Sequence, residues 1–377
     1  MPLFRFLRAA ILAGGLVLYA QDASLVLRTS VTYRTQRNSL TLSDEQRQKA
    51  DQLSREAEQA NREGKFGEAI RAYYHGMAVM HDVSWTPGFE FAAALQGRLD
   101  HAVAAPGEPV TITLSPLYNG ASSDKIKMTA ALALVSPPKA ALPEKSLTSD
   151  VPIDPMAHPI TTRITLPADA SGDYTLEVRL HIEGETPPPA ARSGLVKVLP
   201  MHVEALAADA GKLRDRLSKV TKKSSPALPS AEYVLDFYER ADRGDANPTS
   251  HHFREEFARA NEILDALEAG ADPFAGKHGD FRKAYLSTVD HTLQPYRILV
   301  PEVYNGRAPS PLVVALHGMG GDENAIFDVY NGAFKPAAER VGFIVVCPKG
   351  RDTASMYRGS AEQDVICLLY TSDAADE

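Results

Sequence analysis

The spacing of apolar residues differs from one part of the chain to the next, and in the first part it is the spacing of a helix. Between Ser43 and Met80 apolar residues recur at helical spacing, which predicts a helical hairpin within 23–85. Ser43-Asp-Glu-Gln46 has the spacing of a capping box, in which the serine and glutamine side chains cap the first turn of a helix. Residues 21–40 show no clear period, so we expect an irregular lead-in there.

From 88 to 200 the apolar residues alternate with polar ones, as in a strand with one buried face. The alternating stretches are short, and turns rich in proline and glycine separate them. They lie at 110–114, 125–129, 164–166, 174–180 and 193–199. This pattern predicts a small antiparallel β-sandwich over 88–200. Helical spacing returns between 201 and 280, where we expect a connector of short helices.

The last part of the chain, 281–366, has the pattern of a strand-turn-helix-strand unit. Residues 312–316 are an unbroken apolar run, which is typical of a parallel strand covered on both faces. A helix is expected from Asn324 to Arg340, and a second buried strand over 342–347. The fold class predicted for the whole chain is therefore multi-domain α+β: helical hairpin, antiparallel β-sandwich, helical connector and an incomplete α/β sheet at the C-terminus.

Composition and charge exclude several classes of protein. Apolar residues make up 44% of the chain and charged ones 23%, which is ordinary for a globular protein. The net charge is -8 and basic residues are scattered, so we expect no nucleic-acid partner. The two cysteines, Cys347 and Cys367, indicate no disulfide framework.

The N-terminus has the charge and length of a targeting segment. Arg5 and Arg8 precede an apolar run over 9–20 that ends in small residues, which predicts a secretory signal peptide over 1–22. The run is short for a membrane span, although an uncleaved anchor is the alternative. We therefore expect a secreted or periplasmic protein with no membrane span beyond the signal peptide.

A glycine-rich turn follows the apolar run 312–316, and it carries a family resemblance. Leu316-His317-Gly-Met-Gly-Gly321 resembles the oxyanion-hole strand of α/β-hydrolases, in the form found in esterases and lipases. Upstream, the stretch around Asp290, Gln294 and Tyr296 resembles the opening strands of secreted esterases. These are polyhydroxybutyrate-depolymerase-like, feruloyl-esterase-like and prolyl-oligopeptidase-like enzymes. The resemblance implies a serine hydrolase, most simply a carboxylic-ester hydrolase that acts through an acyl-enzyme on an ester-bearing small molecule or polymer.

The same resemblance gives roles to three residues of the turn. The backbone N–H of Met319 would be one donor of the oxyanion hole, and Gly318 would form the turn. His317 would support this loop, since the base of the triad lies late in the chain in this fold. A plain strand-to-helix turn is the alternative. Asp290, Gln294 and Tyr296 are expected to fix the opening strand.

No nucleophile, acid or base of the triad is found in this chain. The sequence contains no Gly-x-Ser-x-Gly, and residues 367–377 resemble a translated sequencing-adaptor tail. We therefore expect the N-terminal fragment of a hydrolase, inactive by itself. Because the nucleophile strand would lie beside 312–316, we also expect one edge of that strand to be unpaired.

No cofactor or metal is expected. His251-His252, followed by Glu255 and Glu256, lacks the spacing of a metalloprotease helix and is expected to be a solvated helix start at Ser250.

Two further resemblances lie upstream of the hydrolase-like segment. Residues 60–73 resemble half of a tetratricopeptide repeat, and 172–178 resemble a late strand of an immunoglobulin-like domain. The sandwich would then be a spacer or would present substrate. Two functional alternatives remain: a prolyl-oligopeptidase-like peptidase, and a non-enzymatic envelope protein that binds a partner through the hairpin and sandwich.

Overall fold

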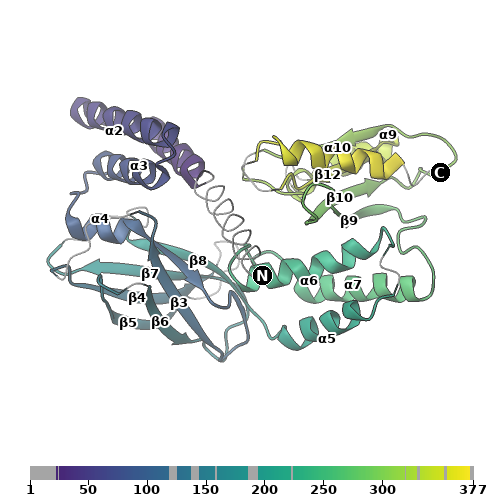
Figure 1. The fold of residues 1–377 in the computed structure, drawn as a ribbon, viewed down its shortest axis with the longest axis horizontal. Helices are drawn as coiled ribbons and strands as arrows, with labels where there is room; N and C mark the ends of the chain where they lie inside the picture. Colours follow the sequence, from purple (N-terminus) through teal and green to yellow (C-terminus); the bar gives the residue numbers. More distant parts are fainter. Residues whose placement is uncertain are drawn as a thin grey trace, which may run out of the picture. The chain divides into compact units, whose positions relative to one another are not determined.

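The structure is a computed structural model and describes residues 23, 25–118, 125–136, 144–157, 159–185, 194–221, 224–318, 320–328, 332–351 and 355–373. The predicted signal peptide and Met319 lie outside the described residues. Within them the chain is a mixed α+β protein with three sheets, none of which closes into a barrel (Figure 1). It divides into two compact units: residues 1–204 with 242–249, and residues 205–241 with 250–377. No described helix is both long enough and apolar enough to cross a bilayer.

The first unit begins with three helices. They span 25–39, α2 (Asp44–Arg62) and α3 (Phe66–Met80). The capping box is confirmed, because the Gln46 backbone N–H donates to Ser43 Oγ and the Ser43 N–H donates to Gln46 Oε1 at 3.0 Å. The irregular lead-in predicted over 21–40 is wrong for 25–39. That helix is held to α2 by the Tyr33 hydroxyl, which donates to Ala50 O at 2.6 Å.

Two sheets and a short helix complete the first unit. The helix, α4, spans Pro87–Ala94. The first sheet has the order β1-β3-β6, with β1 at Leu95–Leu99, β3 at Pro109–Pro116 and β6 at Ile160–Thr165. The second has the order β2-β8-β7-β4-β5, formed by Val103–Ala104, Val196–Val203, Gly172–Ile182, Met128–Val135 and Lys145–Ile153. Side chains of both sheets, among them Ile112, Leu132 and Leu176, share one core.

Two expectations for this region are wrong in detail. The alternation expected from 88 onward is replaced by α4, whose start carries a Thr86 side-chain cap and Pro87 in the first turn. The strand expected at 125–129 lies at 128–135, where Ala130, Leu132 and Leu134 point into the core.

The second unit opens with three helices. They are α5 (Ala207–Ser218), α6 (Leu228–Asp242, with Asp242 itself grouped in the first unit) and α7 (Phe253–Glu268). Tyr238 of α6 packs between Phe253 and Phe257 of α7. The helix start predicted at Ser250 is wrong, because α7 begins at Phe253 and Ser250 has a positive φ of 66°.

The sheet of the second unit has the order β11-β12-β10-β9. Its strands are β9 (Gly279–Leu286), β10 (Leu293–Val300), β11 (Leu312–Val314) and β12 (Ile344–Pro348). β11 and β12 are parallel, whereas the other neighbours are antiparallel. Among the described strands β11 has β12 as its only neighbour, so the predicted unpaired edge is confirmed. The strand itself is shorter than the predicted 312–316.

Helices cover both faces of this sheet. α8 (Ala325–Asp328) and α9 (Phe334–Val341) place Phe327 and Ala338 against Val345 on one face. On the other face α10 (Ser360–Asp373) places Leu368 against Val346. The single helix predicted from Asn324 to Arg340 is therefore wrong, because the described parts of that stretch form two separate helices. α10 runs through residue 367, where the sequence predicts the start of the tail; that boundary stays a prediction.

Candidate functional site

The glycine turn lies directly after β11, at the carboxyl end of the parallel pair. Gly320 has a φ of 89°, a left-handed conformation that favours glycine. A Cβ at Gly321 would lie 3.1 Å from the Cβ atoms of both His317 and Ala325, so a larger residue there would require these neighbours to shift by a few tenths of an ångström. The Gly321 N–H donates to Gly318 O at 3.1 Å and closes the turn. The backbone conformation thus favours glycine at 320, and close packing favours it at 321.

His317 is buried, and its ring lies between two carbonyl groups. Nδ1 lies 2.9 Å from Gly318 O, and Nε2 lies 2.7 Å from Lys349 O in the loop after β12. The backbone N–H of His317 donates to the Tyr357 hydroxyl at 3.1 Å. A neutral imidazole carries one N–H and can donate to one of these two carbonyl oxygens. Both ring nitrogens face backbone groups, so the ring connects the glycine turn to the neighbouring loop.

Tyr357 is a part of this site that the sequence did not single out as a support. Its hydroxyl donates to Pro348 O at 3.2 Å and accepts from His317, so it joins the ends of β11 and β12. Burial raises the pKa of Tyr357 further above neutral pH, so its hydroxyl stays a donor over a wider pH range than that of an exposed tyrosine. A Cβ at Gly350 would collide with the Tyr357 ring, so glycine is needed there too. No sequence signal links these two positions.

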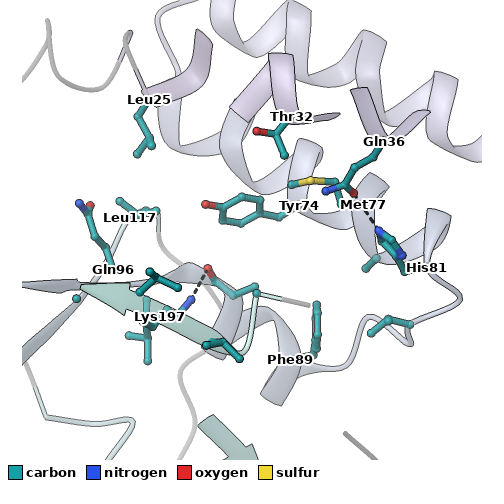
Figure 2. Close-up of a pocket in the computed structure, with 18 of the residues that line it drawn as sticks. Leu25, Thr32, Gln36, Tyr74, Met77, His81, Phe89, Gln96, Leu117 and Lys197 are labelled. Carbon is teal, nitrogen blue, oxygen red and sulfur yellow. Dashed lines mark hydrogen bonds between the residues drawn. The ribbon is translucent and has the colours of Figure 1, made fainter. Parts of the chain in front are cut away.

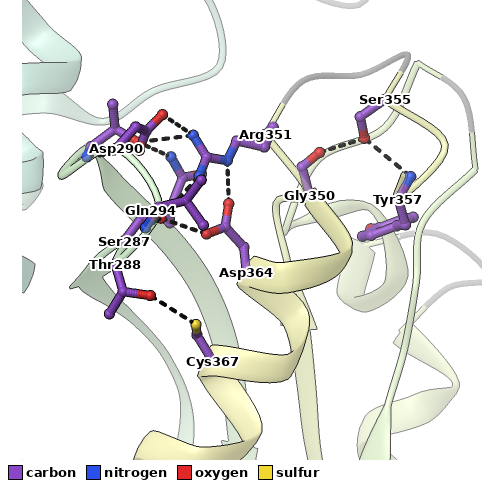
Figure 3. Close-up of polar contacts among 12 residues, drawn as sticks. Ser287, Thr288, Asp290, Gln294, Gly350, Arg351, Ser355, Tyr357, Asp364 and Cys367 are labelled. Carbon is purple, nitrogen blue, oxygen red and sulfur yellow. Dashed lines mark hydrogen bonds and ion pairs between the residues drawn. The ribbon is translucent and has the colours of Figure 1, made fainter. Parts of the chain in front are cut away.

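A second polar cluster lies in the same unit, centred on Arg351 (Figure 3). Its guanidinium pairs with the carboxylates of Asp364 and Asp290 and donates to Ser287 Oγ at 2.9 Å. Ser287 Oγ in turn donates to Asp364 at 2.7 Å. Burial by itself lowers the pKa of Arg351, but Asp364 and Asp290 outweigh it and raise the pKa above its ordinary value. The cluster fixes the β9–β10 turn to α10 and to the loop after β12.

The Arg351 cluster has the residue types of a catalytic site but not the geometry. Ser287 is fully buried, and its hydroxyl proton is already donated to Asp364. A nucleophilic serine needs an exposed oxygen and a base that can accept its proton, whereas Asp364 is ion-paired with Arg351. Asp290 and Gln294 both bond Thr292, at 2.7 Å in each case. Their contacts stabilise the turn into β10.

Glu323, two residues past the glycine turn, is the buried acid of this region. Burial is the largest effect on the pKa of Glu323 and raises it. Arg282, whose Nε lies 3.3 Å from Glu323 Oε1, acts in the opposite direction and lowers this pKa. Arg282 also faces Glu256 of α7 at 3.4 Å and donates to Asn324 Oδ1 at 3.3 Å. These contacts attach the start of the α8 segment to β9 and α7.

The described residues contain no group of three or more His, Cys, Asp or Glu side chains placed to hold a metal ion. His251 packs its ring against Phe237, with the centroids 4.1 Å apart. The chain matches no protein-family model, and no curated protein matches it significantly.

Proposed function

We propose that the second unit is the opening part of an α/β-hydrolase domain of a secreted serine esterase. In this proposal the glycine turn after β11 supplies one donor of an oxyanion hole, the Met319 N–H. The nucleophile, acid and base belong to residues that this sequence does not contain. The 377-residue chain would therefore bind no acyl group covalently.

The observation that carries the proposal is the position of the turn. It leaves the carboxyl end of a parallel strand, where open α/β sheets place their ligand-binding loops. Two further observations support it. The His317 ring is engaged by Gly318 O and Lys349 O, which suits a support for the loop. Among the described strands β11 pairs with β12 alone, as the proposal of a further parallel strand requires.

The first test is the activity of the chain as it stands. Because it lacks a nucleophile, we expect no stoichiometric labelling by a fluorophosphonate probe. For the same reason, hydrolysis of p-nitrophenyl acetate should be no faster than with His317→Ala. Stoichiometric labelling of a single serine would contradict the proposal.

The second test uses the gene beyond the codon for Ile366. We expect an in-frame Gly-x-Ser-x-Gly there. In a protein extended to include it, Met319→Pro removes the backbone N–H and should lower kcat by about 10²–10³. Met319→Ala keeps the N–H and is the matched control, with kcat close to that of the parent. A continuation without a serine elbow removes the esterase proposal, and with it the peptidase alternative.

A further inference from the structure

The first unit contains a cavity of about 740 Å³ that the proposed esterase function does not use (Figure 2). Its walls come from the helix at 25–39, α3, α4 and the strands β1 and β8. Most of the lining is apolar, including Leu25, Met77, Phe89, Leu117 and Leu199. This volume and this lining are typical of sites that enclose a small organic molecule.

One charged side chain, Lys197 of β8, lines this cavity. Side chains two apart share one face of a strand, so Lys197 lies on the same face as Leu199 and Met201, which are both in the core. Its Nζ lies 3.4 Å from Ala93 O, a long contact. No aspartate or glutamate is among the lining residues, and no described carboxylate forms an ion pair with Lys197. A cation thus occupies a position where the strand pattern calls for an apolar residue.

No carboxylate among the lining residues balances the charge of Lys197. Burial lowers the pKa of Lys197 to about 7, and burial is the cause of the shift. The other titratable lining groups are Tyr74 and His81 of α3, and His81 is engaged by Gln36 at 3.0 Å. Among the described residues the Tyr74 hydroxyl has no hydrogen-bond partner, although it lines the same cavity. The cavity therefore offers an occupant the Lys197 amine, which is charged below its lowered pKa or when an anion lies beside it, and a phenol donor.

We infer that this cavity binds a small amphipathic acid, with the apolar body among Met77, Phe89 and Leu117 and the carboxylate at Lys197. An anionic head would supply the counter-charge that Lys197 lacks, and Tyr74 could donate a second hydrogen bond to it. The apolar body would gain affinity by leaving water. A neutral ligand would fill the cavity but would leave the cation without a partner.

The test compares dodecanoate with dodecanol, which has the same chain and no charge, by isothermal titration calorimetry of the full chain. We expect one dodecanoate per chain and an affinity at least about tenfold higher than for dodecanol. Lys197→Met should lower dodecanoate affinity by at least about tenfold and leave dodecanol affinity unchanged, while Lys197→Arg should keep most of the preference. Lys127→Met is the matched control, since Lys127 is 75% exposed and outside the cavity.

Two further readouts separate the site from a general effect on folding. Met77→Trp would narrow the part of the cavity assigned to the apolar body and should weaken binding of both probes. In the unsubstituted protein at pH 8, binding of dodecanoate should take up about one proton, as Lys197 becomes charged beside the carboxylate. Titrations in buffers of different ionisation enthalpy measure this uptake, and Lys197→Met should lose it.

Equal affinity for the acid and the alcohol would overturn the inference, as would dodecanoate binding that Lys197→Met leaves unchanged. Binding of both probes that Met77→Trp leaves unchanged would place the ligand elsewhere and would also overturn it. None of these outcomes bears on the esterase proposal, because Met319 and the glycine turn belong to the other unit.

Discussion

Two partly buried basic side chains, Arg351 and Lys197, differ in whether the protein supplies carboxylates to balance their charge. Arg351 is 15% exposed and meets two carboxylates and a serine hydroxyl. Lys197 is half-buried among apolar groups and meets one distant carbonyl oxygen. Where the protein pairs a buried charge, removing one partner is strongly destabilising, because the other charge is left uncompensated. A charge that it leaves without a counter-ion weakens the fold, which is why Lys197 and not Arg351 indicates a ligand.

The largest expected effect removes the buried partner of Arg351. Asp364→Ala leaves the guanidinium without its most buried carboxylate, and we expect the second unit to lose about 3 kcal/mol of unfolding free energy. Asp290→Ala is the matched control, because Asp290 is 42% exposed, and it should cost less than about 1 kcal/mol. Hydrogen exchange of the β10 and β12 amides measures both. Equal losses would mean that burial does not set the strength of this cluster.

Lys197→Met should have the opposite sign. It removes a charge without a counter-ion and should stabilise the first unit by about 1 kcal/mol at pH 6. Because the folded pKa is lowered to about 7 from an ordinary value near 10.4, the unfolded chain binds more protons between these values. Stability of the parent therefore rises with pH across this window, and the gain from the substitution shrinks toward pH 10. Urea denaturation followed by fluorescence of Trp85, the one tryptophan, checks this.

His202 provides a cation in the first unit that does have counter-ions. Burial lowers its pKa, but Asp173 at 2.7 Å and Glu204 at 3.0 Å outweigh burial and raise it. A raised folded pKa stabilises the protein below the unfolded value, and the contribution is lost as pH rises through the folded value. Stability should fall by less than about 1 kcal/mol from pH 5.5 to 8.5 because of this group.

The same Trp85 denaturation curves, measured at both pH values, test this smallest effect. His202→Gln should remove the part of the fall in unfolding free energy between pH 5.5 and 8.5 that is due to the imidazole. Lys197→Met should leave that part unchanged. A parent whose stability increases over the whole range, and equally in His202→Gln, would show that the carboxylates do not act through His202.

The sequence predicts elements well where local pattern and packing agree. The capping box at Ser43 and the alternation over 174–180 are examples, and β7 extends the latter to Gly172–Ile182. The apolar pattern of the sequence does not predict the helix at 25–39, because the buried face of this helix includes Thr29 and Ser30. Their hydroxyls are satisfied locally, by Leu25 O and Leu27 O at 2.8 Å each, and this conceals the apolar stripe.

Tertiary packing overrides local preference at two other places. The alanines of β4 favour helix by propensity, but pairing with β5 and β7 on both sides makes the segment a strand. Residues 88–94 of α4 are all buried, so the sequence of this helix shows no alternation of apolar and polar faces from which a helix could be predicted.

The candidate sites show the same division between local and distant information. The glycine turn could be found from sequence because its residues are adjacent along the chain. Tyr357 and Gly350 approach it from a loop about forty positions away, and only folding brings them to His317. One local signal for the cavity did exist: Leu195-x-Lys197-x-Leu199 puts a lysine on an apolar face, a violation of binary patterning that marks functional positions.

The open side of β11 has a consequence for how the second unit could be studied. Leu312 and Leu316 are 40% and 48% exposed, and β11 pairs with β12 alone among the described strands. Such an edge is a receptor for an incoming strand of suitable register. A separately made polypeptide that carries such a strand could therefore extend the sheet, and the appearance of new function on mixing would reveal what the added strand provides.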